Sequence, residues 1–180
     1  MFRRVSLEKG CGVTKKIKQM TAEIDSYSSM QDFCNYFMKE MGSLYQLASL
    51  LTGNSERAEE SILAAMEDCQ RAKVFKPWLQ SWGRLAVIER ALKAAKDSVP
   101  QERNAKDTPM ERRAILQLDR FERVVYTLSV LEKYSIRDCA ILLRATKREI
   151  SEAKVRALRE VSTFLASVYG AQENAIALGA

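Results

Sequence analysis

The sequence predicts an all-α protein of two small helical domains joined by a linker, the C-terminal one a helix-turn-helix. In several long segments, apolar residues recur every three or four positions, which is the period of an amphipathic helix. Gly and Pro, which interrupt helices, number only seven and three in 180 residues. A polar stretch with two prolines, residues 97–112, separates two helical runs and is expected to be the linker.

The N-terminal domain is predicted to span residues 29–96, after a loose basic arm at residues 1–28. Ser29 and Asp32 have the spacing of a capping box, so a first helix is expected to begin there. Gly53 is expected to end this helix. The apolar residues at helical spacing along it are Phe33, Phe37, Met41, Leu44, Leu47, Ala48 and Leu51.

Two further helices are predicted in this domain. Asn54 or Ser55 can cap the second, and Pro77 stands at the start of a third, which covers about residues 78–96. Acidic residues predominate up to about residue 69 and basic ones after it, which indicates two surfaces for two partners. The apolar stripe of the second helix contains Ala58, Ile62, Met66 and Cys69.

The C-terminal domain is predicted at residues 113–170, before a tail at residues 171–180. Two capping boxes, at residues 135–138 and 146–149, predict helices that start near 136 and 147. The first runs to about Leu143, so the spacing is that of a helix-turn-helix, although corners of ordinary helical bundles share it. A preceding amphipathic helix is expected to contain Leu118, Phe121, Val125, Leu128 and Leu131.

The composition argues against an enzyme and against a metal or cofactor site. The chain has no His, the commonest general base and metal ligand, and no Gly-rich phosphate loop. Cys11, Cys34, Cys69 and Cys139 form no CxxC pair, and we expect the last three to be buried in a reducing cytoplasm. No run of about 18 apolar residues occurs, so a cytoplasmic protein without membrane insertion is predicted.

One C-terminal segment resembles the fourth region of bacterial RNA polymerase sigma factors, especially the extracytoplasmic-function group: LDRFERVVYTLSVLEKYSIRDCAILLRATKREISEAKVRAL. The family pattern begins with a leucine-proline pair and then an arginine. A motif of acidic residue, Gly, hydrophobic residue and Ser follows, and after it come Glu-Ile-Ala and an Arg-Ala pair. The same spacings occur here, without a gap, at Leu118-Asp119, Arg123, residues 132–135, residues 138–140 and Arg156-Ala157. The family's turn Gly is Arg144 in this chain.

The N-terminal half is similar to the second region of the same family. The Leu-Tyr start, the Thr-Gly pair and the Ala-Glu-acidic run of that region all occur in the segment LYQLASLLTGNSERAEESILAAM. The part of the family that follows this region is similar to the segment FKPWLQSWGRLAVIERALK. The resemblance covers roughly residues 30–168. Two matching regions in the right order, separated by a linker, are more specific than either region alone.

The resemblance implies a non-enzymatic sigma factor whose partners are core RNA polymerase, promoter DNA and an anti-sigma factor. Basic residues at the start of a recognition helix can neutralise phosphates and reach base edges in the major groove. The residues implied to contact DNA are Lys147, Arg148, Ser151 and Lys154 on that helix, Arg137 and Arg156 beside it, and Arg84, Arg90, Lys93 and Lys96 near the site of strand opening. The residues implied to contact the polymerase are Glu59, Glu60, Ile62 and Leu63.

Departures from the family pattern motivate an alternative to the sigma-factor interpretation. The usual Gln-Glu pair is Leu63-Ala64, the Asn of the promoter-melting segment is Leu85, and a Ser-Arg recognition pair is Glu152-Ala153. These changes fit a degenerate sigma-like protein-interaction module that binds an anti-sigma factor or polymerase without reading promoters. A helix-turn-helix regulator that acts without polymerase is a third alternative, which leaves the N-terminal resemblance unexplained.

Two groups of residues have a structural alternative to a functional role. Trp78 and Trp82 lie four positions apart, and we expect them to pack in the core rather than to stack on an unpaired promoter base. The cluster of Lys147, Arg148 and Lys154 has the alternative of a solvated helix face.

Overall fold

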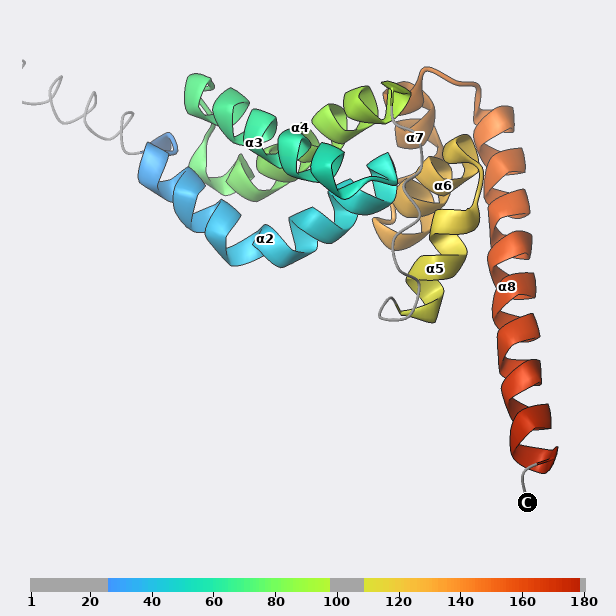
Figure 1. The fold of residues 1–180 in the computed structure, drawn as a ribbon. Coiled ribbons are helices and arrows are strands. Elements are labelled where there is room, and N and C mark those ends of the chain that lie inside the picture. Colours follow the sequence, from blue (N-terminus) through green and yellow to red (C-terminus); the bar gives the residue numbers. More distant parts are fainter. Residues whose placement is uncertain (1–25, 98–108, 179–180) are drawn as a thin grey trace, which may run out of the picture.

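A computed structural model describes residues 26–97 and 109–178 of the chain (Figure 1). Within these ranges the chain is helical, with one isolated bridge between Tyr27 and Phe75, so the predicted all-α class is confirmed. Nearly all of the predicted basic arm and most of the predicted linker lie outside the described residues.

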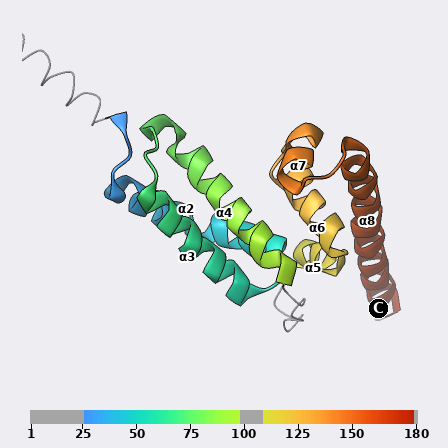
Figure 2. The same ribbon diagram turned by 90° about the horizontal axis from the view of Figure 1, so that it is seen from above.

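The N-terminal half contains three helices that pack against one another, namely α2 (Met30–Thr52), α3 (Ser55–Arg71) and α4 (Leu79–Ala94) (Figures 1 and 2). The predicted capping box at the start of α2 is present. Ser29 N–H donates to Oδ2 of Asp32 at 2.8 Å, and Asp32 N–H donates to Oγ of Ser29 at 3.2 Å. The hydrogen bond from the Ser29 backbone lowers the pKa of Asp32. Asn54 caps α3 by accepting from the Arg57 N–H at 3.1 Å.

α4 is shorter than the sequence predicts. A 3₁₀ turn that contains Pro77, η1 (Lys76–Trp78), precedes it, and a second one, η2 (Ala95–Asp97), follows it. α4 crosses α2 closely at Gly83, where a Cβ atom would lie 2.5 Å from Cε1 of Tyr36. Glycine therefore sets how closely these two helices approach.

The described part of the C-terminal half contains α5 (Met110–Gln117), α6 (Arg120–Tyr126), the π-helical segment η3 (Thr127–Leu131), α7 (Ile136–Leu143) and α8 (Lys147–Leu178). α5 begins inside the segment that the sequence predicts to be the linker. It forms because Ala114 and Ile115 pack with Ala157 and Val161 of α8 in a small apolar cluster. α8 continues to Leu178, through most of the segment expected to be a tail.

The amphipathic run predicted after the linker is not a single helix. The backbone is extended at Leu118 and Asp119, with ψ of 147° and 146°, so α5 and α6 are separate elements. Val125 and Leu128 of the predicted apolar stripe are fully buried, as expected, whereas Phe121 is exposed. The stripe continues from α6 into the π-helical turn of η3.

The larger of two apolar core clusters contains side chains from both halves of the chain. Leu44 and Val87 belong to it in the N-terminal half, and Val125, Leu128 and Ile150 belong to it in the C-terminal half. A second, smaller cluster joins Leu50 of α2 to apolar residues of α5 and α8, so the two halves contact each other, and their division into two domains stays a prediction. The candidate functional helices of both halves are therefore held in one packed arrangement.

A buried arginine of α6 lies where the two halves meet. Arg123 is 2% exposed, and its Nε donates to the carbonyl of Leu50, near the C-terminal end of α2, at 3.0 Å. Its Nη1 donates to the carbonyl of Leu118 at 3.4 Å. Helix C-terminal carbonyls carry partial negative charge, which favours a guanidinium there. Burial lowers the pKa of Arg123.

We predict that Gly53→Ala destabilises the protein. Gly53 ends α2 with φ of 70°, and a Cβ atom there would lie 2.8 Å from Nη2 of Arg123. Both the left-handed backbone and the crowding oppose alanine, so the free energy of unfolding should fall by about 1–3 kcal/mol. Urea unfolding measures this change.

Gly42→Ala is the matched control for that prediction. Gly42 lies in the interior of α2, and apart from the adjacent residues and the backbone of its own helix turn, no heavy atom lies within 4 Å of an added Cβ atom. Alanine should stabilise the protein there by about 0.5–1 kcal/mol, because it favours the helix. Equal effects of the two substitutions would contradict the constraint at Gly53.

Candidate nucleic-acid interface

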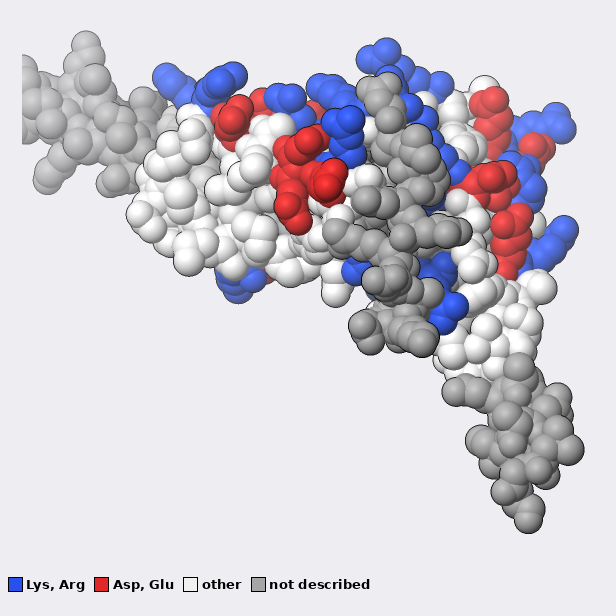
Figure 3. Space-filling view, viewed as in Figure 1, with Lys and Arg blue, Asp and Glu red and all other residues white. Residues whose placement is uncertain are grey.

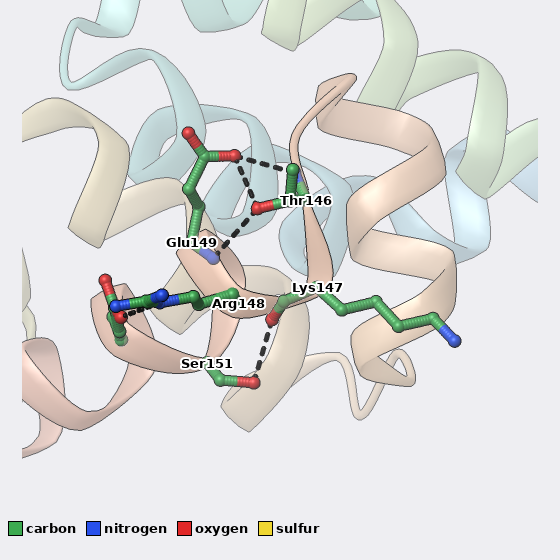
Figure 4. Close-up of polar contacts among 6 residues, drawn as sticks. Thr146, Lys147, Arg148, Glu149 and Ser151 are labelled. Atoms are coloured by element: carbon green, nitrogen blue, oxygen red, sulfur yellow. Dashed lines mark hydrogen bonds and ion pairs between the residues drawn. The ribbon is translucent and has the colours of Figure 1, made fainter.

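Side-chain caps define the turn between α7 and α8. Ser135 caps α7 by accepting from the N–H of Asp138 at 3.1 Å. The chain then turns at Arg144, whose backbone is left-handed with φ of 53°. Oγ1 of Thr146 accepts from the N–H of Glu149 at 3.2 Å, and the Thr146 N–H donates to Glu149 Oε2 at 2.7 Å (Figure 4). The short helix, tight turn and long helix have the spacing that the sequence predicts.

The acidic residues at the two helix starts are engaged in these caps. The pKa of Glu149 is lowered, chiefly because its carboxylate accepts the backbone N–H of Thr146. The carboxylate of Asp138 accepts the hydroxyl of Ser135 at 2.6 Å. Glu149 therefore bends back over the start of α8 instead of extending along the face that carries Lys147 (Figure 4).

The first turns of α8 have one buried face and one polar face. Ile150 and Ala153 are fully buried in the core, whereas Lys147, Arg148 and Ser151 are exposed. The Lys147 side chain extends away from the helix axis, and Ser151 Oγ donates to the Lys147 carbonyl at 2.9 Å (Figure 4). These three residues share a solvent-facing surface, which is what DNA contact would require.

Two arginines of the predicted DNA surface are already paired with carboxylates. Arg148 Nε lies 2.7 Å from Oε1 of Glu152, one helical turn along α8. Arg156 Nε pairs with Oε1 of Glu122 on α6, and this hydrogen bond raises the pKa of Arg156. The Arg148 side chain is 88% exposed, so its pair contributes little stability and is easily exchanged.

The two arginines predicted on α4 are also paired. Arg84 makes a bidentate contact with Glu132, Nε to Oε2 at 2.6 Å and Nη2 to Oε1 at 2.7 Å, which raises the pKa of Arg84. Nη1 of Arg84 donates to Oγ of Ser43 at 2.9 Å. Arg90 Nε donates to Oδ2 of Asp68 at 2.6 Å. The predicted DNA contacts with no carboxylate oxygen within 4.0 Å among the described residues are Lys93, Lys96, Arg137, Lys147 and Lys154.

The predicted polymerase contacts do not all reach the surface of α3. Glu59 and Glu60 are exposed, and Glu60 lies 2.9 Å from Nη1 of Arg57. Leu63 is 62% exposed. Ile62 is 4% exposed because it belongs to the apolar stripe that packs into the core, so its side chain is not open to a partner in this structure.

The two tryptophans differ in burial. Trp82 packs against the core, as expected, but Trp78 is 66% exposed, which corrects the expectation that it is buried. The Trp78 ring meets Phe75 edge-on at 5.7 Å, and Phe75 stacks on Tyr27 at 4.4 Å. This aromatic cluster could not be predicted from the sequence, because it depends on the isolated bridge that joins Tyr27 and Phe75.

Two non-glycine residues in the described part of the chain have positive φ. They are Lys133, with φ of 59°, and Arg144, with φ of 53°. Side chains rarely adopt this left-handed conformation, which suits glycine best.

The cysteines that the sequence predicts to be buried differ in their burial. Cys69 and Cys139 are buried, and burial raises the pKa of Cys69 to about 11, whereas Cys34 is only partly buried. No group of three or more potential metal ligands occurs among the described residues. None of the described helices combines the length and the apolar character that crossing a membrane requires.

A scan against protein-family models and a search of curated proteins found no match for this chain. The motifs and the geometry described above are therefore the observations that a proposed function has to explain.

We predict strong coupling between Arg84 and Glu132 in a double-mutant cycle. Their side chains are 31% and 14% exposed, so screening by water is limited. The coupling energy from Arg84→Gln, Glu132→Gln and the double variant should be about 1–3 kcal/mol in urea unfolding. The matched cycle at Arg148 and Glu152, with side chains 88% and 50% exposed, should give about 0.5 kcal/mol or less. Equal coupling at the two sites would contradict a structural role for Arg84.

Proposed function

We propose that this chain is a sigma factor of the extracytoplasmic-function type, a cytoplasmic and non-enzymatic protein that binds core RNA polymerase and directs it to promoters. The observation that carries the proposal is the left-handed backbone at Lys133 and Arg144. These residues bracket α7, and the sigma pattern has Gly at both positions. The left-handed backbone at these two positions supports the proposal, because glycine is the residue that suits this conformation best.

In this proposal α7, the turn and α8 act as a helix-turn-helix, and α8 is the recognition helix. Its N-terminus carries partial positive charge and exposes Lys147, Arg148 and Ser151 on one face. Lys147 would neutralise a backbone phosphate, and the hydroxyl of Ser151 would accept from or donate to a base edge. The buried Ile150 and Ala153 hold the opposite face on the core.

The N-terminal half would carry the polymerase contact and the strand-opening surface as a second domain. Glu59 and Leu63 on α3 offer an acidic and apolar surface to the polymerase. The exposed ring of Trp78, with Lys73 and Lys76 exposed nearby in the sequence, offers a stacking surface and positive charge to an unpaired strand. An anti-sigma factor remains a candidate partner of the same surfaces.

The second candidate function is a sigma-like interaction module that does not read promoters. One observation favours it: Arg84, Arg90, Arg148 and Arg156 are all paired with carboxylates of the same chain. Paired arginines release fewer counterions on binding DNA, because their charge is already partly neutralised. In this alternative, α3 would bind a protein partner and α8 would serve only the fold.

Co-elution with purified core RNA polymerase and transcription from a library of genomic fragments test the proposal together. Co-elution with promoter-dependent transcripts supports a sigma factor, and co-elution without transcripts supports the interaction module. Absence of co-elution would reject both. Leu63→Asp should abolish co-elution, whereas Met38→Asp, at a position 78% exposed on α2, should preserve it.

We predict that Lys147→Ala weakens binding to random-sequence duplex DNA and reduces its salt dependence. Loss of one phosphate contact should lower the slope of log K against log salt concentration by about 0.9. Fluorescence anisotropy at several salt concentrations measures the slope. Lys39→Ala, which removes an exposed lysine of α2, is the control and should leave the slope unchanged. A slope unaffected by Lys147→Ala would exclude α8 from the phosphate backbone.

Glu152→Gln should have the opposite effect in the same assay. The substitution removes a negative charge from α8 and releases Arg148 from its ion pair. Binding to the duplex pool should become tighter and more salt-dependent, because one more cation is free to meet a phosphate. Weaker binding, or no change at any salt concentration, would argue for the interaction module.

A further inference from the structure

A cleft lies between the C-terminal end of α4, the start of α6 and the end of α7, and its volume is about 720 Å³. Its floor is apolar and includes Leu92, Phe121, Ile141 and Leu142. Ile141 is 66% exposed and Phe121 is 40% exposed, so this apolar surface is open to solvent. The volume lies in the range of small-molecule sites, which is about 300–1,000 Å³.

Four cations surround this floor: Lys93, Lys96, Arg120 and Arg144. None of them has a carboxylate oxygen within 4.0 Å among the described residues, unlike the paired arginines of the predicted DNA surface. Arg120 Nη1 donates to the Lys96 carbonyl at 3.3 Å, which joins two residues of the cleft lining. Lys and Arg side chains gather where α4 approaches α7 (Figure 3). The cleft therefore carries a net positive charge, with four cations and one carboxylate, Glu89, among its described lining residues.

The lining also limits which anion fits. All polar side chains among the described lining residues are charged, and the acidic one is Glu89. The described lining contains no hydroxyl or amide side chain. A nucleotide base or a sugar would leave polar groups unpaired against the floor, which is costly. An aliphatic chain would cover the floor and remove its exposed apolar surface from water.

We propose that this cleft binds a free anionic amphiphile, a long-chain carboxylate or phosphate monoester, with its head group on Arg144 and Lys96 and its chain along Phe121 and Ile141. The lining residues come from both halves of the chain, so the ligand stabilises the packed arrangement over any separated one. The evidence for this binding site is the shape and charge of the cleft, so the site does not depend on the proposed function.

Isothermal titration calorimetry of the full chain with dodecyl phosphate, below its micelle concentration, tests the site. Dodecyl phosphate should bind about tenfold or more tightly than butyl phosphate, with a negative heat-capacity change, because the longer chain covers more of the floor. Inorganic phosphate should bind weakest. Equal affinities for the three compounds, or tighter binding of ATP than of dodecyl phosphate, would overturn the proposal.

Arg144→Gly is the variant that removes a head-group contact without weakening the fold. Arg144 has φ of 53°, so glycine relieves backbone strain while the cation is lost. Lys133→Gly is the matched control, because Lys133 has φ of 59° and lies outside the cleft lining. Arg144→Gly should weaken dodecyl phosphate binding about tenfold, and Lys133→Gly should leave it unchanged. Equal losses in the two variants would show that binding reflects overall charge and would overturn the site.

A separate variant tests whether the aliphatic chain of the ligand lies on the apolar floor. Ile141→Ser should weaken binding of dodecyl phosphate but hardly that of butyl phosphate, because only the longer chain reaches beyond the head group. Val155→Ser, at a position 56% exposed on α8, is the control and should change neither. Loss of chain-length selectivity in Val155→Ser, or its retention in Ile141→Ser, would contradict the proposed position of the chain.

Discussion

The buried guanidinium of Arg123 is the constraint on which the packing of this molecule depends. A buried charge is costly unless hydrogen bonds satisfy it, and here the Leu50 and Leu118 carbonyls accept from it. The negative end of the α2 dipole meets this charge, and Gly53 leaves the space that the side chain fills. α6 is thereby fixed against the end of α2, which brings the C-terminal half onto the same apolar core as α3 and α4.

This packing determines which cations remain available to a partner. Arg84 reaches across to Glu132 only because the two halves are in contact, and that pairing occupies a side chain predicted to face DNA. Separation of the halves would release Arg84 and expose the apolar surface around Val125 and Leu128. Lys147 needs no such change, because it is exposed at the start of α8. In the proposed sigma factor, engagement of the N-terminal half with DNA is therefore coupled to opening of the packed arrangement, whereas contact by α8 is not.

Local features of this fold could be predicted from the sequence, and long-range features could not. The caps at Ser29 and Thr146 depend on residues three positions apart, so their spacing alone revealed them. The exposure of Trp78 depends on how η1 packs, and the α5 helix depends on α8, which is distant in the sequence. The same limit applies to the candidate site, where spacing identified the polar face of α8, but only the tertiary structure revealed the ion pairs of its arginines.

The claim that both halves form one packed unit around Arg123 can be tested directly by comparing two unfolding signals. Both tryptophans of the chain, Trp78 and Trp82, lie in the N-terminal half, so their fluorescence reports on that half alone. Far-UV circular dichroism reports on the helices of both halves. If the halves share one core, urea midpoints from the two signals coincide in a single transition. A fluorescence transition separated from the circular dichroism transition would show that the halves unfold independently and would contradict the account.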